Sequence, residues 1–162
     1  MKKSLLIIAI IAVIIIGVAY AVSPYFTSTT VYEALPNSAL PTKMEEKTMI
    51  EEKMTKVYSG TFVGMGDGIH DAQGIVMSIP SDNGNDILRI ENFKVTNGPD
   101  LYVYLATDNK ASEFVNLGKL KANNGNQNYE IPSKTDLEKY NRVLIWCKTF
   151  GVLFGNAELS SK

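Results

Sequence analysis

The sequence is poor in the residues that build most cofactor and catalytic sites. Its 162 residues include one Cys, one His and one Trp. A disulfide, a Cys/His zinc site, a covalently attached c-type haem and a two-His copper site each need more ligands than one such chain holds. Charge of one sign is also lacking, because 16 basic residues face 17 acidic ones and leave no basic field for a nucleic-acid backbone. These site types are therefore excluded within one chain, and nucleic acid is not a predicted partner.

No enzyme motif stands out. The acidic residues are dispersed without a catalytic pair, and a lone His gives a serine triad no support. The GMGDG string at 64–68 lacks the G-x-G-x-x-G spacing and precedes a strand pattern, so we expect a loop there. The SDNGND string at 81–86 has an incomplete ladder of calcium ligands, so we expect a hairpin turn. Whether the chain is an enzyme stays open, with nothing in favour of it.

One long apolar run, residues 5–22, follows Lys2 and Lys3. Eighteen residues at about 1.5 Å each extend roughly 27 Å as a helix, close to the thickness of a bilayer. The two lysines should hold the N-terminus in the cytoplasm, which places the rest of the chain outside. The sequence therefore predicts a single-pass membrane protein whose C-terminal domain, residues 58–162, is extracytoplasmic.

A cleaved signal peptide is the alternative interpretation of the same run. The string Ala19-Tyr20-Ala21 has the small-x-small form that a signal peptidase accepts, and cleavage near Ala21 would give a secreted domain. The apolar stretch is longer than a usual signal core, which favours a retained anchor at residues 1–22. Both interpretations export the domain.

Residues 23–57 are rich in Ser, Thr, Pro and charge, which predicts a tether. If flexible, about 35 residues have a root-mean-square reach of roughly 30–35 Å. Within it, residues 43–56 have the composition of a short solvated helix. Met44, Met49 and Met54 could bind soft copper, but a five-residue spacing winds around a helix, so a spacer is the favoured interpretation.

The chain after the tether has the pattern of a single β domain of about a hundred residues. Turn-forming strings rich in Asn, Gly, Pro and Asp separate short apolar runs, and one short helix is predicted at 134–140 with Ser133 as its N-cap. The predicted strands are residues 58–63, 74–79, 87–93, 101–107, 127–131, 142–148 and 152–159. Such a pattern is typical of an all-β antiparallel sandwich or barrel, here of about seven to eight strands.

The VLIWC string at 143–147 is apolar at every position and predicts a central strand. Alternation places Cys147 on one face with Val143 and Ile145, and Trp146 on the other. In the next strand Gly155 contributes to a thin face that something could approach closely.

Cys147 and His70 are the residues with distinctive chemistry. An unpaired Cys in an exported protein is either shielded in a core or used as a thiol or ligand, and free Cys is often buried. His70 is either an ordinary loop residue or an assisting ligand. The residues alone leave both alternatives open, and they do not show whether the two side chains meet.

Residues 60–159 resemble the DM-thirteen family of Skeletor-type domains, commonly described as electron-transfer domains. The resemblance rests on GTF at 60–62, His70 with Ala72 and Gly74, LRIENF at 88–93, NGPDLYVYL at 97–105, LGKLK at 117–121, GNQNYEIP at 125–132, VLIWC at 143–147 and FGVLFG at 150–155. It implies a β-sandwich whose Cys147 acts in redox chemistry, as a bare thiol or through a prosthetic group such as haem, with His70 assisting. Candidate residues lining such a site are Trp146, Phe150, Gly151 and Gly155.

Two functions follow as expectations. The first is a membrane-anchored extracytoplasmic redox or electron-transfer module that uses Cys147 and meets a redox partner protein. The alternative is a non-catalytic cell-surface interaction module that binds protein or glycan. The sequence names no metal, no definite cofactor and no oligomeric state.

Overall fold

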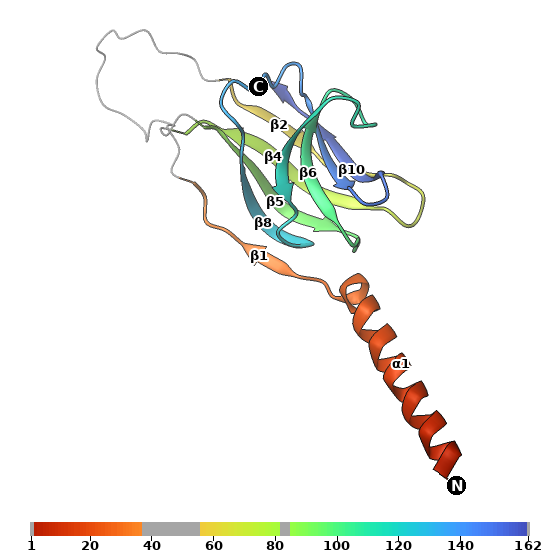
Figure 1. The fold of residues 1–162 in the computed structure, drawn as a ribbon. Coiled ribbons are helices and arrows are strands. Elements are labelled where there is room, and N and C mark those ends of the chain that lie inside the picture. Colours follow the sequence, from red (N-terminus) through yellow and green to blue (C-terminus); the bar gives the residue numbers. More distant parts are fainter. Residues whose placement is uncertain (1, 37–55, 82–84, 162) are drawn as a thin grey trace, which may run out of the picture.

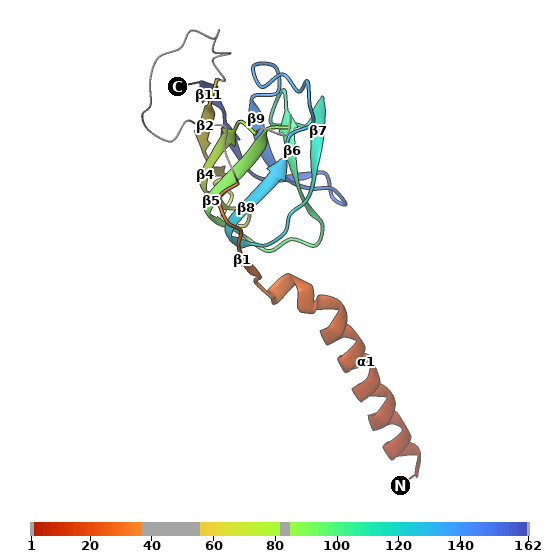
Figure 2. The ribbon, with the colours of Figure 1, turned by 90° about the vertical axis from the view of Figure 1, so that its left-hand side faces the viewer.

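A computed structural model describes residues 2–36, 56–81 and 85–161. The chain begins with helix α1 (Lys2–Phe26), which extends away from the β domain (Figures 1 and 2). Its segment Ser4–Ser23 has a mean hydropathy of 3.2 and is fully exposed. A helix of this length and composition fits a single-pass membrane anchor or a signal sequence.

The β domain consists of two sheets packed face to face (Figures 1 and 2). One sheet has the order β1-β8-β5-β4-β2-β11 and the other β3-β10-β9-β6-β7, with β1 the one parallel partner in the described pairs. The strands are β1 (Thr30–Tyr32), β2 (Tyr58–Thr61), β3 (Val63–Gly64), β4 (Ala72–Ile79), β5 (Ile87–Val95), β6 (Leu101–Ala106), β7 (Phe114–Lys119), β8 (Asn124–Glu130), β9 (Arg142–Cys147), β10 (Val152–Glu158) and β11 (Ser160–Ser161). The predicted antiparallel sandwich is confirmed; the described strands form two open sheets, not a closed barrel.

The core lies between the two sheets. β9 is the central strand of its sheet, as predicted, and Val143, Ile145 and Cys147 all face this core. Leu144 and Trp146 lie on the opposite face in a second apolar cluster. Burying a large aliphatic side chain of this kind contributes about 1.5–3 kcal/mol, and burial on both faces fits the central place of β9 in its sheet.

The absence of a side chain at Gly155 lets the two sheets approach closely. A Cβ there would collide with the side chain of Ala72 in β4, which belongs to the other sheet. Phe154 occupies a register shift between Leu153 and Gly155, and its side chain also enters the core. The shift places Gly155 on the inner face, whereas simple alternation put it with Leu153.

The prediction of a helix at 134–140 is wrong. This segment forms turns, because Lys134 has a positive φ of 71°, which a right-handed helix cannot accommodate. The carboxylate of Asp136 accepts the N–H of Glu138 at 2.9 Å, and Tyr140 N–H donates to Asp136 O at 2.8 Å. One turn therefore forms and does not propagate.

Two predictions fall on residues outside those described. They are the helix at 43–56, apart from Lys56, with the three methionines inside it, and the central positions 82–84 of the predicted hairpin turn. The strands that flank this turn, β4 and β5, do pair antiparallel, with Ile79 opposite Ile87.

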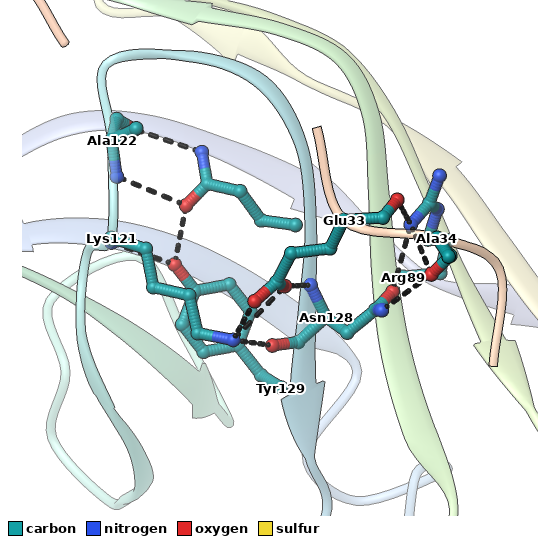
Figure 3. A network of polar contacts seen from close by, with 8 residues as sticks. Glu33, Ala34, Arg89, Lys121, Ala122, Asn128 and Tyr129 are labelled. Carbon is teal, nitrogen blue, oxygen red and sulfur yellow. Dashed lines mark hydrogen bonds and ion pairs between the residues drawn. The ribbon is translucent and has the colours of Figure 1, made fainter. Parts of the chain in front are cut away.

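The segment after α1 joins the domain as an edge strand, although its sequence was typical of a tether. β1 runs parallel to β8, with Thr30 opposite Asn124. From β5, the side chain of Arg89 donates from Nη1 to the carbonyls of Glu33 at 2.8 Å and Ala34 at 3.2 Å (Figure 3). Arg89 is 3% exposed; its Nε pairs with the Glu91 carboxylate at 3.1 Å, and its Nη1 donates to this segment.

Glu33 fastens the same segment through its side chain. Its carboxylate accepts from Lys121 Nζ at 2.7 Å and from the Asn128 N–H at 2.6 Å (Figure 3). Partial burial raises the pKa of Glu33, but the bonds from Lys121 and Asn128 outweigh it and hold the pKa below its usual value. The chain is thus ordered against the sheet through residue 34, and three residues, 27–29, separate β1 from α1.

Candidate functional site

A cleft of about 700 Å³ opens beside the edge of the five-stranded sheet. Its lining includes Met65, Asp67, His70, Lys110, Trp146 and Gly151. These residues come from three places in the sequence: the loop between β3 and β4, the loop after β6, and the end of β9 with the hairpin that joins it to β10. The fold therefore gathers them; no local motif does.

Asp67 organises the loop that carries the chain from β3 in one sheet to β4 in the other. Its Oδ1 accepts the backbone N–H of Ile69 at 2.9 Å and of His70 at 2.7 Å. Gly66 and Gly68 on either side have φ of 70° and 77°, which explains the glycines of the GMGDG string. The bonds from the His70 backbone and side chain hold the pKa of Asp67 well below its usual range. This confirms the predicted loop and gives it a fixed shape.

The imidazole of His70 is held from two sides. Its Nδ1 lies 2.6 Å from Asp67 Oδ2, and its ring packs edge-on against Phe154, with 4.5 Å between ring centroids. The side chain keeps 23% exposure. Because a carboxylate at Nδ1 fixes the orientation of the ring, Nε2 is the nitrogen that would meet a ligand or a partner.

Trp146 begins a row of aromatic side chains on the outer face of the five-stranded sheet. It lies opposite Tyr102 in the β6–β9 pairing. Tyr102 and Tyr104 have centroids 6.2 Å apart, and Tyr104 stacks on Phe114 at 4.3 Å. Burial raises the pKa of Tyr104, so its phenol stays protonated. Oxidisable indole and phenol rings thus extend from Trp146 at the cleft to Tyr104.

Cys147 occupies the opposite face of the same strand. It is 1% exposed, packs in the core between the sheets, and is not among the residues lining the cleft. Its backbone carbonyl accepts the N–H of Gly151 at 2.9 Å, which closes the β9–β10 hairpin. The sulfur is therefore shielded from solutes in the folded domain.

A family model described as electron transfer DM13 matches residues 64–159. The chain belongs to this family. The match begins at Gly64, the first residue of the cleft lining, and includes the whole of the lining described above. Neither the curated proteins nor the solved structures gave a match. Membership identifies the β domain as an electron-transfer or redox-related module.

The DM13 domain brings together some of the candidates from the sequence and separates others. His70, Trp146 and Gly151 line one cleft. Phe150 is 64% exposed at the tip of the hairpin, and Gly155 is buried between the sheets; neither lines the cleft.

Sequence reasoning missed Met65, Asp67 and Lys110 in the lining. For Asp67 a signal existed: an Asp three residues before a His, between glycines, is typical of a side chain that caps a turn. No sequence pattern marks Lys110 as a site residue, because the loop after β6 lies beside the cleft only in the folded domain. Among the described residues no group of three or more His, Cys, Asp or Glu side chains could hold a metal ion.

Proposed function

We propose that the protein is a membrane-anchored, extracytoplasmic electron-transfer module that exchanges single electrons with a redox partner at the cleft of His70 and Trp146. The observation that carries this proposal is that one cleft, inside the region matched by the family model, joins an oriented imidazole to an oxidisable indole. Electron exchange with a partner needs redox-active or ligating groups near the protein surface, and the imidazole of His70 and the indole of Trp146 both lie near it.

The position of Cys147 supports the cleft, not the thiol, as the exchange site. Thiol exchange and oxidation to sulfenic acid need an accessible thiolate. A sulfur in a residue that is 1% exposed, packed in an aliphatic core, offers none. In the proposal Cys147 reacts as a thiol only when the hairpin at 148–151 opens.

A prosthetic group such as haem fits one of the two candidate ligands. His70 would hold it through Nε2, because Asp67 occupies Nδ1 in the manner of a ligand-orienting carboxylate. Cys147 does not fit, because its side chain lies on the core face. Haem would supply a one-electron couple when bound; the contribution of this chain would be to orient the imidazole and to exclude water on the Phe154 side.

The proposed anchor is α1, retained after export. Lys2 and Lys3 before the apolar helix support a cytoplasmic N-terminus. Cleavage near Ala21 would remove most of α1 but leave β1 and its contacts with Arg89 and Lys121. A retained anchor and a cleaved signal peptide therefore differ in where the domain is located and not in how it folds.

A second candidate function is a non-catalytic interaction module, with glycan as the ligand. The observation favouring it is that Asn109 and Asn156 line the cleft beside Trp146. An aromatic ring with neighbouring amides can stack on and hydrogen-bond a sugar. This function needs no redox activity and predicts that His70 is replaceable.

The test is a spectroelectrochemical titration of the full chain purified from its native membrane. We expect a reversible one-electron transition that His70→Ala abolishes or shifts. Phe114→Ala is the control, because Phe114 is a partly exposed ring outside the cleft. A wild-type protein with no redox transition, which binds oligosaccharide instead, would reject electron transfer in favour of the second candidate.

A further inference from the structure

One end of the sandwich gathers two of the three cleft loops, the loop between β3 and β4 and the β9–β10 hairpin, at the point where the chain arrives from α1. Thr30, the first residue of β1, lies opposite Asn124 in β8, and Asn124 lies opposite Lys94 near the end of β5. At the same end Leu101 lies opposite Cys147, where β9 turns into the hairpin at 148–151. Figures 1 and 2 show α1 leaving the domain from this end, which we call the anchor end.

The connection between α1 and this end is short. Only residues 27–29 lie between the end of α1 and the start of β1. Three residues span at most about 10 Å, so the anchor end cannot move far from the end of the helix. The contacts of Arg89 and Glu33 keep β1 on the sheet and prevent the linker from lengthening by detachment.

Exposed apolar side chains lie on two loops of the anchor end. Ile69 is 70% exposed and Met65 44% exposed in the loop before β4, and Phe150 is 64% exposed in the hairpin. These two loops are neighbours, because His70 of one and Gly151 of the other line the same cleft. The three exposed apolar side chains, which we call the patch, therefore lie on adjacent loops of the anchor end.

The charges around this patch suit a lipid surface. Lys94 and Lys148 are exposed at this end, where they could meet lipid phosphates. Its acidic side chains accept hydrogen bonds: Asp67 from its own loop, Asp71 from Gln73 Nε2 at 3.0 Å, and Asp100 from Thr149 at 2.9 Å. Asp100 Oδ1 also lies 4.0 Å from Lys119 Nζ, which offsets part of the negative charge that would approach the bilayer.

We propose that the anchor end rests on the bilayer that holds α1, with Ile69 and Phe150 inserted among the lipid headgroups. The proposal rests on the retained anchor of the proposed function. A short linker makes the contact intramolecular, so even a weak apolar contact is populated. The cleft of His70 then lies beside the membrane surface, and its partner must reach it there.

The test uses full-chain protein in phosphatidylcholine vesicles, with Trp146→Phe as the background that removes the native indole. Phe150→Trp and Ile69→Trp each add one reporter to the patch. Phe114→Trp is the matched control, since Phe114 is 44% exposed and pairs with Ala106, at the opposite end of β6. Flotation of the vesicles reports the anchor, and quenching by lipids brominated on the acyl chain reports insertion. Circular dichroism checks the fold of each variant.

We expect all variants to float, and the two patch reporters to lose about half or more of their emission, because interfacial side chains lie ~5–10 Å into the headgroup and acyl boundary. The control should lose little. A chain that floats but shows equal quenching at all three positions, or none at the patch, would overturn the docking and leave the anchor intact. A chain that does not float overturns both.

Discussion

Arg89 donates a hydrogen bond of 2.8 Å to the backbone carbonyl of Glu33, across 56 residues of sequence. The bond reaches from β5, beyond β8, to the segment that follows β1. It makes the first residues after α1 part of the β domain. The orientation of the domain relative to its anchor is therefore set by the fold as well as by the length of a tether.

Replacing Arg89 with Met should weaken the domain strongly. The change removes the donor of two backbone carbonyls and of Asn128 Oδ1 and the ion-pair partner of Glu91, all at a part-buried place, which costs about 3 kcal/mol. Arg142→Met is the control, because the Arg142 pair with Glu158 is partly exposed and is worth about 1 kcal/mol or less. Urea unfolding of the full chain in detergent measures both, and equal losses would contradict the role given to Arg89.

Gly125→Ala should detach β1. Gly125 has a φ of 105°, and an added Cβ would collide with the carbonyl of Val31. Gly118→Ala carries similar backbone strain, with a φ of 121°, but its Cβ would point into open space. Hydrogen exchange at 30–34 should accelerate in the first variant only. If both variants leave these amides protected, β1 is not held by this close contact.

Acid should loosen the same strand. The folded-state pKa of Glu33 lies below its ordinary value of 4.5, so its ionised form stabilises the fold above that pH. The stabilisation is lost as the pH falls through the lower folded-state pKa. Glu33→Gln should therefore be less stable than wild type at neutral pH and equal to it in acid. A difference in stability that stays constant from pH 7 to pH 2 would argue against the Glu33–Lys121 pair as the cause.

The thiol of Cys147 should resist alkylation while the protein is folded and react after unfolding, because the residue is 1% exposed. Cys147→Ala leaves a small cavity and should cost roughly 2 kcal/mol or less. It should leave electron transfer in place if the cleft is the exchange site. Rapid alkylation of the native protein would return the thiol to the centre of the mechanism.

Much of the fold was predictable, because strong apolar runs mark the central strands. Alternation along the VLIWC string correctly placed Cys147 on one face with Val143 and Ile145, but because the string is apolar at every position it could not show which face packs against the other sheet. β1 and β7 were missed because TVY and FVNLGK are short or polar edge strands whose burial depends on their neighbours. The positive φ at Lys134, the first residue of the predicted helix, has no sequence signature.

The site was harder to predict than the fold. The string at 143–147 drew attention to Cys147, whereas Trp146 beside it is the residue that lines the cleft. His70 and Lys110 line the same cleft only because the loop between β3 and β4 and the loop after β6 both lie beside the β9–β10 hairpin. No periodicity encodes a contact of that kind, and it became visible only in three dimensions.

The most direct test of the central claim is a redox titration of the full chain from its native membrane, followed at equilibrium by absorbance, for wild type, His70→Ala and Cys147→Ala. We expect a reversible one-electron transition in wild type that persists in Cys147→Ala and is lost or shifted in His70→Ala. A transition that survives in His70→Ala and disappears in Cys147→Ala would contradict the account.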